Sequence, residues 1–141
     1  MAIIWLTGNS GAGKTTLADM LCKDDGWIKL DGDEMRSSIS LGAGFSKADR
    51  EAHNLRVARL AKVLHKQQFN IVISVIAPFR SVREKVKSVI PECRWIYIKR
   101  DGLDKPDRPY EEPYDTITID TGKHNINESY KLLRRAIHEQ T

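Results

Sequence analysis

The sequence predicts a three-layer α/β fold, in which a mainly parallel central sheet lies between two layers of helices. Short apolar runs rich in β-branched residues alternate along the chain with stretches of helical spacing. The run "NIVISVI" (70–76) is apolar almost throughout, as expected of a strand that helices cover on both faces. The length of 141 residues favours one domain, spanning residues 1–141.

The first part of the chain predicts two strands and two helices. "AIIWLT" (2–7) is a short buried strand that ends at a glycine. Residues 15–23 follow as a helix, because two leucines and an alanine recur on one face. "GWIKL" (26–30) predicts a second strand, which ends in "DGD". A short helix at 34–39 follows it.

A long helix comes next, and its first residue is marked in the sequence. Ser46 and Asp49 have the spacing of a capping box, so the helix should begin near Lys47. The apolar run 70–76 follows this helix as a central strand. Pro78 then ends the strand.

The remaining elements continue the alternation. "RSVREKVKSVI" (80–90) places valines and an isoleucine at helical spacing. "RWIYIK" (94–99) and "TITID" (116–120) predict two more strands, and "NESYKLLRRAI" (127–137) predicts the last helix. The stretch 101–115 is the one long irregular segment, because it is rich in proline and charge.

Composition and charge set limits on location and partners. The net charge is +4 and 40% of the residues are hydrophobic, which is ordinary for a soluble domain. Cys22 and Cys93 form no metal-binding pattern and suit a reducing compartment. The start "MAIIWL" lacks a basic leader, and no apolar run is long enough to span a membrane. We therefore expect a cytoplasmic protein without membrane or nucleic-acid partners.

The stretch "GNSGAGKTT" (8–16) matches the phosphate-binding pattern G-x-x-x-x-G-K-[ST], between the first predicted strand and helix. Backbone N–H groups there can point at phosphate oxygens. Lys14 can reach the β- and γ-phosphates, and the Thr15 hydroxyl can ligate Mg²⁺. The fold class is therefore that of P-loop NTPases, with ATP and Mg²⁺ as the expected cofactors. The predicted ATP-binding residues are Gly8, Asn9, Ser10, Gly11, Ala12, Gly13, Lys14, Thr15 and Thr16.

Three classes of P-loop protein compete for this sequence. A GTP switch would normally carry an N-K-x-D segment, which is missing, and a hydrolysing machine would end its central strand in aspartate. Here the acidic residues follow the second strand instead, at Asp31 and Asp33. Asp33 can accept a proton from an acceptor hydroxyl or hold the water shell of a metal, with Asp31 supporting it. These features favour a small-molecule kinase with Lys14 and Asp33 catalytic, and Thr15 and Asp33 at the metal.

The long helix carries a stripe that changes character along its length. Its apolar face consists of Val57, Leu60, Ala61 and Leu64. Continued toward the N-terminus, the same face reaches Asn54, His53 and Arg50. Inward-facing polar residues at one end of a core helix indicate a polar cavity. The alternative is that the helix start protrudes into water.

An aromatic residue and several arginines complete the candidate acceptor site. Phe45, beside the helix cap, can stack on a base or merely staple the helix. Arg36, Arg50, Arg80 and Arg83 are candidate anion contacts, because guanidinium binds phosphate or sulfate through two parallel hydrogen bonds. Of the four, Arg83 is the one most expected to be a solvated surface residue.

Several motifs together resemble the adenylylsulfate kinase family. They are, in chain order, "WLTGNSGAGKTTLA", "LDGDEMR", "GFSKADRE", "IAPFRSVRE" and "RPYEEP". The resemblance implies transfer of the ATP γ-phosphate to the 3′-hydroxyl of adenylyl sulfate, with Mg²⁺. It places Asp33 at the acceptor hydroxyl and metal. It places Arg36, Phe45 and Arg50 on the acceptor nucleotide, with Phe45 stacked on adenine and Arg80 beside them.

The chain also departs from that family. His53 stands where the family has an acceptor-contacting Asn, and Asn54 follows one place later. Ala77 replaces a family Ser. The family's long lid is reduced to "GLDKP" between "IYIKRD" and "RPYEEP". Arg100, Lys105 and Arg108 are the remaining lid candidates for neutralising phosphate charge. Either a partner subunit, as in a homodimer, or another loop covers the site, or the acceptor is not adenylyl sulfate.

The sequence therefore predicts an ATP-dependent kinase that acts on adenylyl sulfate or a similar nucleotide. The predicted acceptor-binding residues are Asp31, Arg36, Phe45, Arg50, His53, Asn54 and Arg80. A related kinase that acts on a different nucleotide-linked or anionic metabolite is the first alternative. A nucleotide-binding regulatory protein with little catalysis is the second.

Overall fold

A computed structural model describes residues 1–139 of the chain. Strands and helices alternate in it, as the sequence predicts, and the last two residues of the predicted domain, 140 and 141, lie outside the described part. The elements are β1 (Ile3–Thr7), α1 (Lys14–Asp25), β2 (Ile28–Asp31), α2 (Gly32–Arg36), α3 (Lys47–Lys66), β3 (Ile71–Ser74), α4 (Arg80–Val89), β4 (Arg94–Lys99), β5 (Ile117–Asp120) and α5 (Ile126–Glu139).

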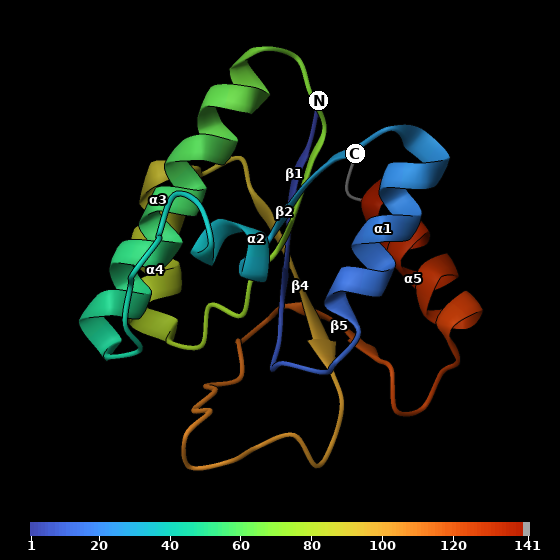
Figure 1. The fold of residues 1–141 in the computed structure, drawn as a ribbon. Helices are drawn as coiled ribbons and strands as arrows, with labels where there is room; N and C mark the ends of the chain where they lie inside the picture. Colours follow the sequence, from blue (N-terminus) through green and yellow to red (C-terminus); the bar gives the residue numbers. More distant parts are fainter. Residues whose placement is uncertain (140–141) are drawn as a thin grey trace.

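The five strands form one sheet in the order β2-β3-β1-β4-β5. Every pair of neighbouring strands is parallel. Helices α3 and α4 lie on one side of this sheet and α1 and α5 on the other (Figure 1). The prediction of a parallel sheet between two helical layers is therefore confirmed.

Two hydrophobic cores, one for each face of the sheet, hold the layers together. In β1, Ile3 and Trp5 belong to the core shared with α3 and α4. The alternate residues Ile4 and Leu6 belong to the core shared with α1 and α5. Because successive side chains of a strand point to opposite faces, a strand covered on both sides must be apolar throughout.

The start of α3 lies where the capping box predicts it. The Ser46 hydroxyl accepts a 3.1 Å hydrogen bond from the Asp49 amide, and the Asp49 carboxylate accepts one of 3.3 Å from the Ser46 amide. Two of the helix's otherwise unpaired N-terminal donors are satisfied in this way.

The short helix α2 differs from its predicted bounds. It begins at Gly32 and ends at Arg36, rather than covering residues 34–39. The hydroxyls of Ser37 and Ser38 both donate to the Glu34 carbonyl oxygen, at 3.0 and 2.6 Å. Such side-chain hydrogen bonds compete with continued helix, so the chain turns instead.

The sheet topology brings three chain segments to one edge. The residues that follow β1, β2 and β3 leave the carboxyl ends of three adjacent parallel strands. In open α/β sheets this edge is where ligands bind.

Candidate active site

The glycine-rich loop after β1 has a backbone that only glycine allows. Gly8 has φ 149°, and a Cβ there would lie 2.2 Å from the carbonyl oxygen of Ile98 in β4. Gly13 caps α1 in the left-handed region, with φ 102°. The loop is thus pressed against the neighbouring strand before it enters the helix, which leaves its amide groups at the helix N-terminus, where phosphate binds favourably.

Lys14 is folded back onto the loop that precedes it. Its ammonium group donates to the carbonyl oxygens of Gly8 and Asn9, at 2.7 and 2.8 Å. Burial lowers the pKa of Lys14 to about 8, although the nearby Asp31 carboxylate favours the charged form. The Lys14 ammonium group therefore lies against the loop, and both of these hydrogen-bond acceptors are neutral carbonyl groups.

Asp31, the last residue of β2, ties three segments of the site together. Its carboxylate oxygen accepts hydrogen bonds from Thr15 at 2.7 Å and from Ser74 at 2.8 Å. Burial by itself raises the pKa of Asp31, but these two hydrogen bonds and the charge of Lys29 outweigh it, so the pKa lies below its usual value. The carboxylate that contacts Thr15 is therefore Asp31, and not Asp33, which the sequence assigned to the metal together with Thr15.

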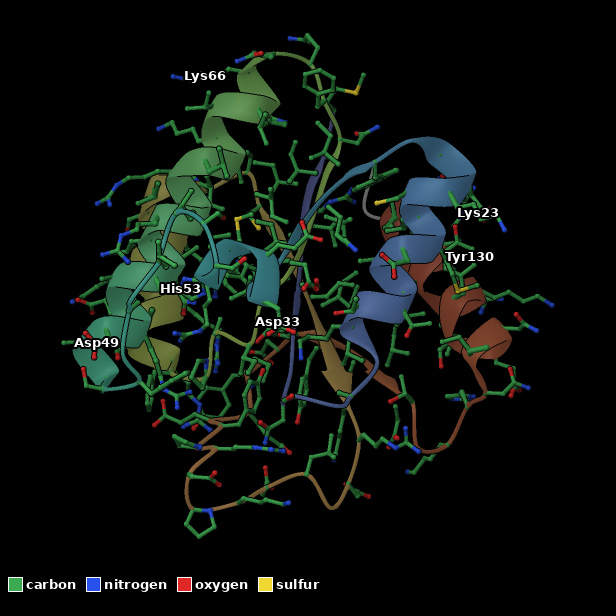
Figure 2. All side chains as sticks on the ribbon, viewed as in Figure 1. Lys23, Asp33, Asp49, His53, Lys66 and Tyr130 are labelled. Carbon is green, nitrogen blue, oxygen red and sulfur yellow. The ribbon has the colours of Figure 1, made fainter. Side chains whose placement is uncertain are left out.

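A cavity of about 360 Å³ opens at this edge of the sheet. It joins the phosphate loop to the ends of β2 and β3 and to the first turns of α3. Figure 2 labels His53 on α3 and Asp33 on α2, and both residues line this cavity. The predicted site residues that line it are Ser10, Gly11, Gly13, Lys14, Thr15, Thr16, Asp31, Asp33, Arg36, Arg50, His53 and Asn54.

The polar first turns of α3 face this cavity, as the stripe on the helix indicates. His53 and Asn54 are each only 2% exposed, and both line the cavity. The alternative reading, in which the helix start protrudes into water, is therefore wrong for these two residues. Arg50 is only partly buried.

Phe45 lies at the rim, between two guanidinium groups. It is 67% exposed, and the Arg36 and Arg50 guanidinium carbons lie 4.4 and 5.6 Å from its ring centroid. Arg36 donates to the Gly44 carbonyl and Arg50 to the Phe45 carbonyl. The loop before α3 thus presents one aromatic face and two cations together, although the ring itself is outside the cavity lining.

Arg80 and the three lid candidates lie away from the main cavity. Arg80 donates through Nε to the Glu112 carbonyl, stacks on Tyr114 at 4.3 Å, and lines a second, smaller pocket. The lid candidates Arg100, Lys105 and Arg108 are exposed, and none lines the main cavity. The structure therefore does not place these four side chains beside the acceptor residues.

Arg83 corrects an expectation. It is 3% exposed rather than solvated, and it donates to the carbonyl oxygens of Ala77 and Glu111, at 2.7 and 2.5 Å. Ala77 has φ 49°, an unusual value for a residue with a side chain. Arg83 thus joins the strained backbone that follows β3 to the irregular segment. The signal was present in the sequence, because Arg83 lies three residues before Val86 and seven before Ile90 on the same helical face.

One further residue of the site, Ser74, was missed, and one predicted residue, Asn9, makes a contact that the sequence did not indicate. Ser74 is the last residue of β3, a strand that contains no acidic residue, and its contact with Asp31 appears only once β2 and β3 pair. Asn9 donates from its side chain to the Leu103 carbonyl and to Asp104, at 3.2 and 3.3 Å. The shortened irregular segment therefore touches the phosphate loop through Leu103 and Asp104, and not through its cationic residues.

Among residues 1–139, no cluster of three or more histidine, cysteine, aspartate or glutamate side chains is suited to hold a metal ion. No helix in the same range is long and apolar enough to cross a membrane.

Comparison with known proteins identifies the family. The sequence model of the adenylylsulphate kinase family matches residues 1–102. The chain belongs to this family. An adenylyl-sulfate kinase of Bacillus licheniformis is 32% identical, over 99% of this chain and 86% of that protein. A probable adenylyl-sulfate kinase of Pyrococcus abyssi is 35% identical, over 96% and 94%.

A solved structure of the family has the same fold. The Mycobacterium tuberculosis APS kinase, in complex with AMPPNP and APS, superposes with a TM-score of 0.81, over 97% of each chain, at 21% identity. The Bacillus licheniformis alignment extends over 170 positions, more than the 141 residues of this chain. That relative therefore carries residues that this chain lacks, which fits the expectation that the irregular segment is shortened here.

Proposed function

We propose that the protein transfers the γ-phosphate of Mg-ATP to the 3′-hydroxyl of adenylyl sulfate. One observation carries the proposal: a single cavity joins the phosphate loop, the carboxylates Asp31 and Asp33, and the polar start of α3. A donor nucleotide and an acceptor can therefore meet between them. Membership of the adenylylsulfate kinase family and the names of its relatives support adenylyl sulfate as the acceptor.

On the donor side, the loop amides and Lys14 stabilise the phosphates. Lys14 exchanges its two carbonyl partners for phosphate oxygens, which are better partners for a cation. Charge that develops on the transferring phosphoryl group is then stabilised by groups already in place.

The residues present fit a magnesium ion. Mg²⁺ prefers oxygen ligands and is usually held by one or two protein groups together with phosphates and water. Thr15 and Ser74 provide two hydroxyls, each within hydrogen-bond distance of the Asp31 carboxylate. When bound, the ion neutralises phosphate charge during transfer. We assign its protein contacts to Thr15 and Asp31, with Asp33 left for the acceptor.

On the acceptor side, Asp33 is exposed within the cavity and accepts the proton of the attacking hydroxyl. Arg36 and Arg50 hold the anionic part of the acceptor, and Phe45 stacks on its base. His53 and Asn54 complete the wall. Arg80, Arg100, Lys105 and Arg108 would have to move to take part, so we give them no role in the resting site.

The direct test is to incubate the protein with γ-labelled ATP and adenylyl sulfate and to separate the products. We expect 3′-phosphorylated adenylyl sulfate from the wild type and from Lys66→Ala, whose site lies at the far end of α3 (Figure 2). Lys14→Ala and Asp33→Asn should lose most of the activity. No product from the wild type at any Mg²⁺ concentration would sink this assignment.

A related kinase with a different nucleotide-linked acceptor is the second candidate. Two observations favour it: the irregular segment reaches the loop only through Leu103 and Asp104, and His53 stands in the acceptor wall. A screen of nucleotide derivatives with labelled ATP distinguishes the two. A regulatory protein would keep its function in Asp33→Ala and lose it in Lys14→Ala.

We also propose a cytoplasmic enzyme in which a second copy of the chain covers the site. The short segment over the loop supports this, because a kinase must exclude water during transfer. Sedimentation with and without nucleotide tests it, and a monomer under both conditions would argue against it.

A further inference from the structure

A chain of three polar side chains runs behind the acceptor wall of the cavity. Nη1 of Arg56 lies 3.2 Å from the Ser40 hydroxyl oxygen, and that oxygen lies 2.7 Å from Nδ1 of His53. Ser40 and His53 are both buried, and His53 lines the cavity. The chain connects the outer surface of α3 to the ligand site through the turn after α2.

The direction of these hydrogen bonds follows from the chemistry of the groups. A guanidinium group has only donors, so Arg56 must donate to Ser40. The single proton of the Ser40 hydroxyl is then free for one acceptor, and Nδ1 of His53 is the one within reach. If Nδ1 carried the proton, the buried hydroxyl proton would lose that acceptor, which is costly. Nδ1 is therefore the acceptor, and a neutral ring carries its proton on Nε2.

The ring is neutral at physiological pH. Burial, together with the positive charges of Arg36 and Arg56, lowers the pKa of His53 to about 4. The chain of hydrogen bonds and the surrounding charges thus favour the same state of His53, an uncharged imidazole with its proton on Nε2.

Nε2 of His53 has no protein partner among residues 1–139, and it is not one of the enclosed orphan atoms there. Next to it in sequence, Asn54 is 2% exposed, and its Oδ1 has no partner either. A half-turn of the Asn54 amide exchanges its donor and acceptor ends. The wall therefore offers one uncharged donor, Nε2 of His53, beside an enclosed amide oxygen of Asn54 that has no partner among residues 1–139.

We propose that Ser40 and Arg56 are positioning residues that hold His53 as a hydrogen-bond donor to the acceptor nucleotide. The group recognised is a neutral acceptor atom on the edge of the base, because the His53 donor is itself uncharged. The anionic part of the acceptor is left to the arginines at the rim. This inference rests on the proposed nucleotide kinase activity, which it deepens.

Nitrogen NMR of the free protein tests the tautomer without any assay of activity. Imidazole nitrogens with and without a proton have widely separated ¹⁵N shifts, and His53→Gln identifies the signals. We expect a protonated Nε2 and an unprotonated Nδ1 in the wild type, and a mixture of both tautomers in Ser40→Ala. A wild-type ring protonated on Nδ1 would overturn the proposal.

Steady-state kinetics test the effect on the acceptor. Ser40→Ala, Arg56→Met and His53→Leu should each raise the KM for adenylyl sulfate by roughly fivefold, the order expected for one neutral hydrogen bond. The kcat and the KM for ATP should stay within about twofold, because the donor site is untouched. His53→Gln, which keeps a donor near the Nε2 position, should recover most of the loss. Arg59→Met, an exposed arginine one turn from Arg56, is the matched control.

Calorimetry with adenosine 5′-phosphate separates this inference from the kinase assignment. If the wild type does not phosphorylate adenylyl sulfate, the proposed function fails, but the base contact still predicts weaker binding of the probe to His53→Leu than to the wild type. Ribose 5-phosphate, which lacks the base, should bind both proteins equally. Equal binding of adenosine 5′-phosphate to the two proteins contradicts the inference, whatever the reaction proves to be.

Discussion

The Thr15 hydroxyl donates a 2.7 Å hydrogen bond to the Asp31 carboxylate. This contact joins the second residue of α1 to the last residue of β2, and Ser74 of β3 adds a second hydroxyl to the same carboxylate oxygen. The oxygen groups needed beside a nucleotide's phosphates are thus assembled from three elements before any ligand binds. The same contact is the reason that we assign Asp31 to the magnesium ion and Asp33 to the acceptor hydroxyl.

Asp31→Asn and Asp33→Asn should therefore impair the kinase in different ways. Asn at position 31 weakens the contacts that we assign to Mg²⁺, so we expect a lower kcat and a higher Mg²⁺ requirement. Asn at position 33 removes the proton acceptor, so kcat should fall by about 10²–10⁴ with an unchanged Mg²⁺ requirement. Initial rates over a Mg²⁺ titration measure both. The same shift of the Mg²⁺ curve in the two variants would contradict the division of roles.

ATP affinity should depend on pH through Lys14. The pKa of Lys14 in the free protein is about 8, and a bound triphosphate favours the charged amine and raises that pKa. The dissociation constant for ATP should therefore be flat below pH 8 and rise by up to about tenfold per pH unit above it. Lys14→Arg, whose guanidinium stays charged, should bind more weakly but without this dependence. Calorimetric titrations from pH 7 to 9.5 provide the measurement, and an equal slope in Lys14→Arg would refute the assignment.

Arg83→Met should destabilise the fold, because it removes the short donors to the Ala77 and Glu111 carbonyl oxygens and leaves Ala77 only a long contact with the Thr7 hydroxyl at 3.5 Å. An unsatisfied buried group costs about 1–3 kcal/mol, and Glu111 is exposed, so we expect a loss of about 1–3 kcal/mol in the free energy of unfolding. Arg80→Met is the control, since that arginine is only partly buried and should cost less than about 1 kcal/mol. Urea denaturation measures both. Equal midpoints for the two variants would show that the Arg83 hydrogen bonds contribute little.

The buried His53 should make the stability depend on pH in the acid range. Its pKa is about 4 in the folded protein and about 6.5 when unfolded, so between these values the unfolded chain binds the extra proton. The contribution of His53 to the free energy of unfolding should then be fully present above pH 6.5, and it should fall by about 3 kcal/mol as the pH drops to 4.

His53→Gln provides the comparison for that measurement, because it keeps a polar side chain but cannot titrate. Its unfolding free energy should fall less steeply over the same range in urea denaturation. Parallel curves for the wild type and His53→Gln would mean that His53 titrates normally in the folded protein.

Much of the fold could be predicted because its signals are local. The apolar run at 70–76, the capping box at Ser46 and the glycine loop each depend on residues close together in the chain, and each element begins within a few residues of its expected place. The bounds of α2 were wrong because hydroxyl competition after Glu34 is a matter of side-chain rotamers. The helical periodicity that indicated an inward position for His53 and Asn54 also indicates one for Arg83. The prediction for Arg83 was wrong because a charged side chain was expected to be solvated.

The sequence by itself determined the element order, the two-sided burial of the central strands, and the phosphate loop with Lys14, because spacing and local chemistry suffice for these. Only the tertiary structure decided which aspartate meets Thr15, that Ser74 joins them, that Arg80 turns away, and that Ser40 and Arg56 stand behind His53. Each of these contacts joins residues on different elements. Such contacts depend on strand order, register and side-chain rotamers, which the spacing of residues along one chain does not specify.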